Sequence, residues 1–151
     1  MTVRTGPLAG LLVADFSRIL AGPYATMLLA DLGAEVVKVE SPAGDDTRTW
    51  SPPLRDGIST YYLGVNRNKR SVALDLKDER DLDAARELAR RADVLIENFK
   101  PGGLARFGLD YESVSADNPR VVYASISGFG SGPGGRDLPG YDLMVQAISG
   151  L

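Results

Sequence analysis

The sequence contains no cysteine and no histidine among its 151 residues. Without cysteine the chain can form neither disulfide bonds nor thiolate nucleophiles nor cysteine metal sites. Without histidine it can form no Ser-His-Asp triad, no Cys-His pair and no histidine zinc site. Acid–base or covalent chemistry on this chain must therefore use carboxylates, Tyr, Lys, Ser or Thr, and we expect no metal site.

Long apolar runs and a large charge of one sign are also lacking. No apolar run reaches the length that crosses a membrane. The formal net charge of −3 argues against a protein that coats nucleic acid. Together with the absence of cysteine, this predicts a cytoplasmic protein that binds neither membrane nor nucleic acid. What is present, 44% hydrophobic and 25% charged residues, is typical of one globular domain.

Residues 11–40, LLVADFSRILAGPYATMLLADLGAEVVKVE, predict a strand, a helix and a second strand. The helix follows the turn Ala21-Gly22-Pro23, carries an apolar stripe and ends at Gly33. This is a βαβ unit, and parallel sheets bind ligands at the carboxyl ends of their strands. Residues 15–23 and 40–44 are therefore expected to line such a site.

The rest of the chain alternates strands with helices in the same way. We expect further strands at residues 71–76, 93–97 and 120–127, and helices at residues 60–65, 78–92, 101–107, 111–117 and from the N-cap Asp142 onward. Residues 41–57 are expected to form a long loop in which Asp45 and Asp46 are solvated. The pattern predicts an α/β fold: a mostly parallel sheet with helices on both faces.

Basic side chains follow several of the predicted strands. Three of them lie in residues 66–70, NRNKR, which form either a solvated turn or a phosphate contact. Lys77, Lys100 and Arg106 come after strand ends as well. Cations gathered at the carboxyl edge of a parallel sheet suit a ligand that carries several phosphates.

Three turns carry further polar or flexible groups. Asn98 and Phe99 form either a simple strand-to-helix turn or a contact for adenine or phosphate. The segment GFGSGPGG at residues 128–135 fits G-x-G-x-x-G, but Pro133 interrupts it, which favours a flexible loop over a dinucleotide fingerprint. Tyr141 and Asp142 open the last helix, where capping alone explains the aspartate.

With these segments placed, the chain resembles the N-terminal part of the family III CoA-transferases, which include formyl-CoA and carnitine CoA-transferases and 2-methylacyl-CoA racemases. The matching pieces occur in the family's order and cover nearly the whole sequence: GLLVADFSRILAGPYATMLLADLGAEVVKVE, NKRSVALDLK, ADVLIENFKPGGLARFGLDYE, NPRVVYASISGFG and GYDLMVQAISG. The resemblance implies that residues 1–151 form a Rossmann-like domain that binds coenzyme A.

The resemblance also implies site residues. The CoA contacts carried over by position are Ile19, Ala21, Leu74, Lys77, Asn98, Phe99, Arg106 and Phe107. Lys77 and Arg106 would hold phosphates, and Leu74, Asn98 and Phe99 would surround the adenine and ribose. Asp142 and Tyr141 would lie near the reacting thioester as auxiliary catalytic groups.

The family reaction moves CoA between two carboxylic acids through an aspartyl-CoA thioester, and it needs neither histidine nor metal. The resemblance places the nucleophilic aspartate beyond residue 151, so we expect this chain alone to be inactive. Racemases of the family have histidine at the position of Tyr141, which favours a transferase. A racemase, a CoA-binding module without catalysis and a plain NAD-binding domain remain as alternatives.

The resemblance further indicates that the chain is part of a longer parent. The small second domain and the returning C-terminal segment of the family would lie outside it. Such a parent would act on an acyl-CoA and a carboxylic acid as an interlocked homodimer. Residues 143–151 are then expected to expose apolar surface.

Overall fold

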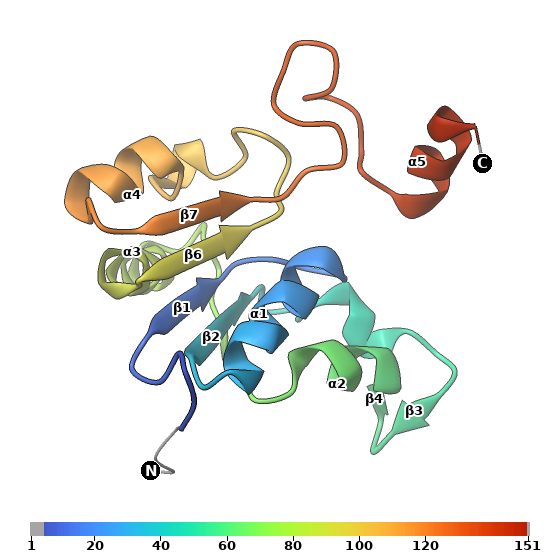
Figure 1. Cartoon of the computed structure of the whole chain (residues 1–151), viewed down its shortest axis with the longest axis horizontal. Helices are drawn as coiled ribbons and strands as arrows, with labels where there is room; N and C mark the ends of the chain where they lie inside the picture. The colour runs from blue at the N-terminus through green and yellow to red at the C-terminus, as the bar shows by residue number, and fades with distance from the viewer. Residues whose placement is uncertain (1–4, 151) are drawn as a thin grey trace.

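The computed structural model describes residues 5–150, and a five-stranded sheet lies at its centre (Figure 1). The strands are β1 (Leu12–Asp15), β2 (Glu35–Glu40), β5 (Arg70–Ala73), β6 (Val94–Glu97) and β7 (Val122–Ser125). They lie in the order β5-β2-β1-β6-β7, and every neighbouring pair is parallel. The predicted parallel sheet is therefore confirmed. The strand order changes direction between β1 and β6, which is where doubly wound sheets bind ligands.

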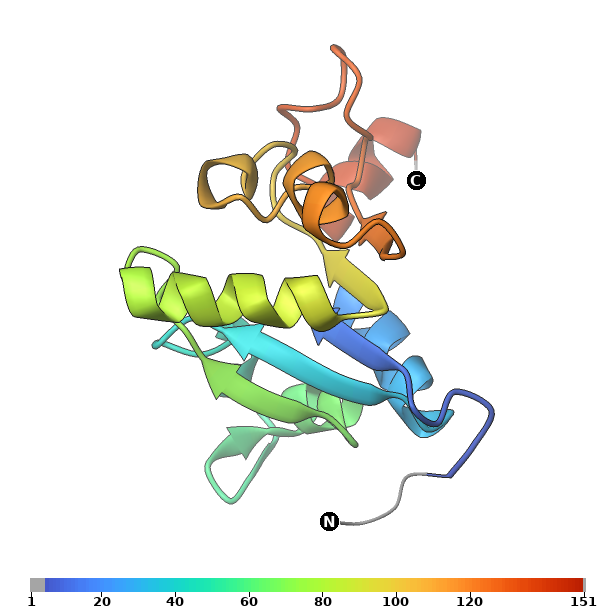
Figure 2. The same cartoon turned by 90° about the vertical axis from the view of Figure 1, so that its left-hand side faces the viewer.

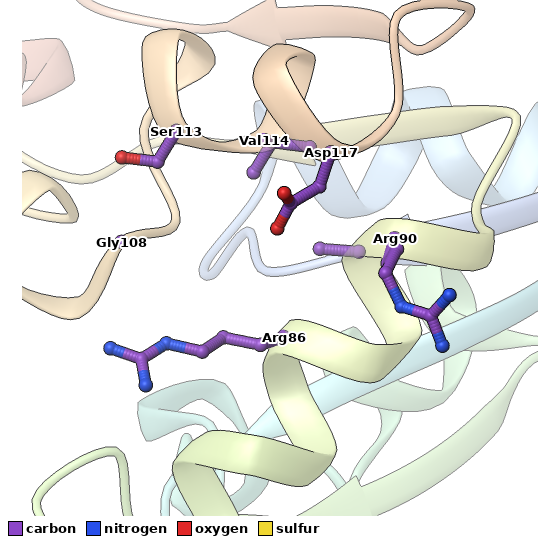
Figure 3. Close-up of a pocket in the computed structure, with 7 residues that line it drawn as sticks. Arg86, Arg90, Gly108, Ser113, Val114 and Asp117 are labelled. Carbon is purple, nitrogen blue, oxygen red and sulfur yellow. The ribbon is translucent and has the colours of Figure 1, made fainter.

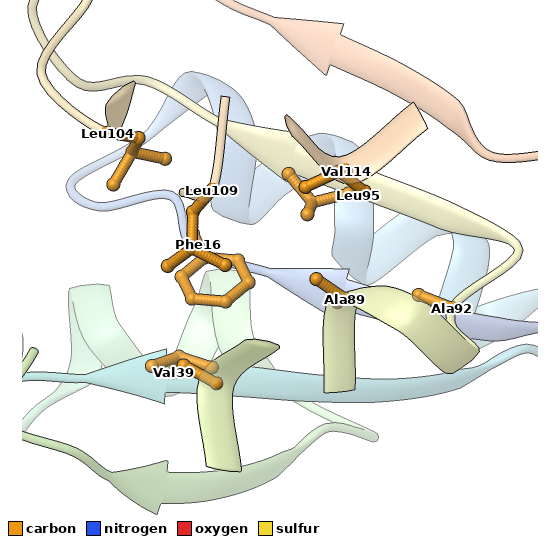
Figure 4. Packing of buried hydrophobic residues seen from close by; sticks show 10 residues of the cluster. Phe16, Val39, Ala89, Ala92, Leu95, Leu104, Leu109 and Val114 are labelled. Carbon is orange, nitrogen blue, oxygen red and sulfur yellow. The ribbon is translucent and has the colours of Figure 1, made fainter. Parts of the chain in front are cut away.

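Helices cover both faces of this sheet, as the sequence predicts. Helices α1 (Ala21–Asp31) and α2 (Thr60–Asn66) lie on one face, and α3 (Glu79–Arg91) and α4 (Tyr111–Asp117) lie on the other (Figure 2). The larger hydrophobic cluster lies under α3 and α4, where the Phe16 ring packs among Val39, Leu109 and Ala89 (Figure 4). A smaller cluster under α1 contains Val13, Ala30, Ala34 and Val36. No helix among residues 5–150 is long and apolar enough to cross a membrane.

Local chemistry explains where α3 begins and where α1 ends. The Asp78 side chain accepts hydrogen bonds from the backbone amides of Arg80 and Asp81, which caps α3. The small residues Ala85 and Ala89 let α3 approach the sheet closely. Helix α1 ends just before Gly33, whose φ of +103° is one that a residue with a Cβ rarely adopts.

Two segments differ from their predicted structure. Residues 41–57 contain the short 3-10 helix η1 (Asp46–Thr49), and they lead into a hairpin of β3 (Leu54–Arg55) and β4 (Ile58–Ser59). These elements are too short to give a hydrophobic period. The helix expected at residues 101–107 is only the 3-10 helix η2 (Ala105–Phe107), because Gly102 before it adopts a φ of +79°.

The last helix, α5 (Asp142–Ser149), follows the glycine-rich loop and lies apart from the sheet (Figure 1). Its N-cap is Tyr141, so the prediction that Asp142 is the N-cap is wrong by one residue. Leu143 and Ile148 are 79% and 61% exposed. The expected apolar surface is therefore confirmed within α5, while residues 1–4 and 151 lie outside the described part of the chain.

Candidate functional site

A cavity of about 180 Å³ lies at the carboxyl edge of the sheet. Its lining comes from the ends of four strands: Phe16 and Arg18 after β1, Val39 to Ser41 in and after β2, Leu74 to Lys77 after β5, and Phe99, Arg106 and Phe107 after β6. These segments are distant in sequence and meet only because their strands are parallel neighbours. The cavity therefore occupies the place where the topology predicts a ligand.

Five of the eight predicted contact residues line this cavity: Leu74, Lys77, Phe99, Arg106 and Phe107. The other three, Ile19, Ala21 and Asn98, do not line it. Asn98 lies beside it, and its amide group bonds to the backbone of Arg18. Asn98 Oδ1 accepts from the Arg18 N–H, and Asn98 Nδ2 donates to the Arg18 carbonyl, both at 2.8 Å. Ala21 is exposed at the start of α1.

Three cations surround the cavity. Within residues 5–150, the side chains of Arg18, Lys77 and Arg106 form no ion pair. The Arg18 guanidinium lies 5.4 Å from the centre of the Phe99 ring, and that of Arg106 lies 4.5 Å from the centre of the Phe107 ring. Stacking of this kind orients a cation while leaving its N–H donors available. The cavity thus offers positive charge and aromatic faces together.

The carboxylate of Glu40 also lies at the cavity wall, but hydrogen bonds from Arg48, Tyr62 and Ser71 offset its negative charge. Arg48 donates to both of its oxygens, at 2.6 and 2.8 Å. Tyr62 and Ser71 each donate a further hydrogen bond of 2.7 Å. Glu40 therefore adds little repulsion toward an anionic ligand.

The hydrogen bonds to Glu40 predict that the fold loses stability as the pH falls. Burial alone would raise the pKa of Glu40, but the hydrogen bonds from Arg48, Tyr62 and Ser71 outweigh it and lower the pKa from 4.5 to about 2. The folded chain thus binds this proton less tightly than the unfolded chain, so the carboxylate stabilises the fold above about pH 4.5 and loses that effect toward pH 2. We expect a contribution of about 3 kcal/mol at neutral pH.

Urea unfolding of the wild type and of Glu40→Gln, measured from pH 7 down to pH 3, checks this contribution. The difference between the two free energies of unfolding should shrink steadily as the pH falls below 4.5. A difference that stays constant over this range would contradict the role given to Glu40.

The basic run at residues 66–70 does not face the cavity. The Lys69 ammonium is buried and donates to Asp15 at 3.0 Å, to the Pro23 carbonyl at 2.8 Å and to Asn66 at 2.8 Å. Burial lowers its pKa to about 8, although the Asp15 carboxylate opposes this. Arg67 and Arg70 pair with carboxylates elsewhere on the surface. Both interpretations of this run, a solvated turn and a phosphate contact, are therefore wrong for Lys69.

Two charged residues that the sequence reasoning missed lie behind the cavity. Asp45 was expected to be solvated, but it is 2% exposed and forms an ion pair of 2.9 Å with the buried Lys38. The expectation fails because η1 folds Asp45 back onto the end of β2. The sequence did indicate that Lys38 is buried and paired, because a lysine inside the apolar run Val36-Val37-Lys38-Val39 needs a buried partner. Lys100, by contrast, pairs with Asp137 on the surface.

Tyr141 and Asp142 do not line the cavity. Tyr141 is 71% exposed. The Asp142 carboxylate accepts a hydrogen bond of 2.7 Å from Gln146 within the same helix. Their auxiliary catalytic roles therefore stay predictions.

A second cavity, of about 280 Å³, lies between α3 and α4 (Figure 3). Arg86, Arg90, Ser113 and Asp117 are among its lining residues. Arg86 already donates to the Phe107 carbonyl at 2.9 Å, and Arg90 pairs with Glu87. The cavity is on a helical face of the molecule and not at a strand end, so the first cavity is the better candidate for a ligand.

Known proteins share both this sequence and this architecture. The human succinyl-CoA:glutarate CoA-transferase is 51% identical over 146 residues, which are 96% of this chain and 33% of the human protein. The succinate–glutarate CoA-transferase of Agrobacterium fabrum is 48% identical over 158 aligned residues, covering 100% of this chain and 40% of the bacterial protein. The chain thus spans about a third to two fifths of the length of these relatives.

A solved structure gives the same result for the fold. The crystal structure of a CaiB/BaiF family protein from Brucella suis is similar with a TM-score of 0.91 and 50% sequence identity. The match covers 97% of this chain and 40% of that one. The sequence model that describes CoA-transferase family III matches residues 8–151. On these grounds the chain belongs to CoA-transferase family III.

Proposed function

We propose that the chain is the CoA-binding part of an acyl-CoA:carboxylate CoA-transferase. The observation that carries the proposal is the cavity at the carboxyl edge. There, three cations that form no ion pair within residues 5–150 come together with the rings of Phe99 and Phe107, on which two of the cations stack. CoA matches these groups, because it carries several phosphates and an adenine ring. The relatives named above transfer CoA between dicarboxylic acids, which supports the same substrate class here.

In this proposal the eight predicted contact residues bind different parts of CoA. Lys77 and Arg106 bind phosphate oxygens, since cationic donors hold such oxygens well. Leu74, Phe99 and Phe107 surround the adenine and ribose with apolar surface. Asn98 contributes the second N–H of its amide group beside them, since the first donates to the Arg18 carbonyl. Ile19, in the loop that joins β1 to α1, and Ala21, the first residue of α1, contribute backbone groups.

The chemical step of the complete enzyme is nucleophilic exchange. An aspartate carboxylate attacks the carbonyl carbon of the acyl-CoA, the C–S bond breaks, and a mixed anhydride and CoA thiolate result. The thiolate then attacks the enzyme's own acyl carbon, which releases the first acid and leaves an aspartyl-CoA thioester. The second acid takes up CoA by the reverse steps. The nucleophile is not among these 151 residues, so the role proposed for this chain is binding, with Asp142 and Tyr141 assisting near the thioester.

Calorimetric titration of the purified chain with CoA, dephospho-CoA and NAD tests the proposal. We expect CoA to bind about 10-fold more tightly than dephospho-CoA, because one charge-assisted phosphate contact is worth about 1.4 kcal/mol or more. NAD should bind more weakly than either. A chain that binds NAD but not CoA would contradict the proposal and favour a plain dinucleotide-binding domain.

A further inference from the structure

The loop that joins β1 to α1 is held by side chains from three other parts of the chain. Lys38 Nζ, from β2, donates to the Ser17 carbonyl at 2.8 Å. The Asn98 amide, just after β6, holds both the N–H and the carbonyl of Arg18. Asp45 Oδ2 accepts from the Ile19 N–H at 3.4 Å. Three consecutive residues thus have backbone groups fixed from outside the loop.

Two of these side chains form a buried ion pair. Lys38 Nζ lies 2.9 Å from Asp45 Oδ2, and both side chains are fully buried. The other oxygen of Asp45 accepts from the Thr47 amide at 3.0 Å and from its hydroxyl at 2.7 Å. A buried ion pair often stabilises a fold no more than apolar residues of the same volume would. Its contacts with the loop backbone therefore point to a purpose other than stability.

The loop conformation itself needs such support. Ile19 has a φ of +70°, which is unfavourable for a β-branched residue and persists only where the surroundings enforce it. Gly22 packs so closely on this loop that an added Cβ would lie 2.2 Å from the Ser17 side chain. Arg18 and Phe16 of the same loop form part of the cavity wall. The shape of the cavity therefore depends on how this backbone is held.

We propose that Lys38 and Asp45 are positioning residues for the cavity. Their ion pair fixes the backbone of Ser17 and Ile19 and so sets Arg18 in the wall, while neither residue lines the cavity. A wall that is fixed in advance lowers the ordering cost of binding a ligand. The ligand here is CoA, so this role rests on the proposed function.

Two measurements on the 151-residue chain test the role: hydrogen exchange of the backbone amides at residues 16–20, and calorimetric titration with CoA. Asp45→Asn keeps an oxygen for the Ile19 amide but removes the charge that holds Lys38. We expect faster exchange at residues 17–19 and CoA binding about 10-fold weaker, the size that loss of a preorganised contact produces.

A double variant separates positioning from stability. Lys38→Met with Asp45→Leu removes both charges and fills the space with apolar groups, so the chain is expected to regain stability relative to Asp45→Asn. Because the loop contacts stay absent, CoA binding should remain weak and exchange at residues 17–19 fast. If CoA affinity returns together with stability, the pair is structural only and the proposal is wrong.

Asn118→Ala provides the matched control. The Asn118 amide is buried and donates to the Ala89 and Ala92 carbonyls, and none of these three residues lines the cavity. This variant should lose stability but keep wild-type CoA affinity and slow exchange at residues 17–19. Unchanged exchange in Asp45→Asn would overturn the inference whether or not CoA binds. Failure of the wild type to bind CoA would instead count against the proposed function, and the exchange data would still decide whether the pair holds the loop.

Discussion

Replacing Asp15 with alanine is expected to lower the free energy of unfolding by about 3–5 kcal/mol, the loss typical of a broken buried ion pair. Asp15 is fully buried at the end of β1. Its carboxylate accepts from Lys69 at 3.0 Å, from the Thr26 hydroxyl at 2.5 Å, and from both the amide and the hydroxyl of Ser17. Alanine would leave the buried Lys69 ammonium without its counter-charge and would take one acceptor each from Thr26 and Ser17. Urea unfolding followed by circular dichroism measures the loss.

Asp56→Asn serves as the control for an exposed aspartate, because asparagine tolerates the φ of +51° at this position better than alanine does. The Arg55–Asp56 pair is separated by 3.9 Å, and the two side chains are 79% and 94% exposed. Its removal should leave the unfolding curve unchanged, because pairs in water contribute little. If Asp15→Ala behaves like this control, the buried charges around Asp15 do not stabilise the fold.

Removing both Lys77 and Arg106 is expected to weaken CoA binding by about 100-fold, with each single alanine variant costing about 10-fold. Both residues line the cavity after different strands, and neither forms an ion pair within the described part of the chain. Their contacts with separate phosphates should therefore add. Both side chains are exposed, so the fold should tolerate their loss. Calorimetric titration at one fixed salt concentration measures the change.

Arg55→Ala removes one exposed cation from the β3–β4 hairpin, which contributes nothing to the cavity lining. It changes the net charge by the same amount as each single cavity variant, so it reports the general effect of charge on CoA binding. We expect its affinity to equal that of the wild type. Equal affinities for CoA in the Lys77/Arg106 double variant and in Arg55→Ala would show that the anion binds elsewhere.

The main features of the fold follow from patterns that are local in sequence. Apolar runs such as residues 11–14 and 94–96 alternate with periodic segments such as residues 78–92, and this alternation is typical of parallel strands with crossover helices. Lys77 and Arg106 were found in the same way, because each follows a strand end and all strand ends of a parallel sheet share one edge. The short elements η1, η2 and the β3–β4 hairpin escaped this reasoning, since they have no period to detect.

The sequence by itself determined the type of sheet, the edge of the sheet at which the cavity lies and the presence of basic residues near that edge. Only the tertiary structure decided which charged side chains form ion pairs inside the fold and which line the cavity. Lys69 meets Asp15 across 54 residues, Lys38 finds Asp45 through η1, and Asn98 reaches Arg18 across 80 residues. The physical reason is that ion pairing depends on distance in space and on burial, and neither quantity is a local property of the chain.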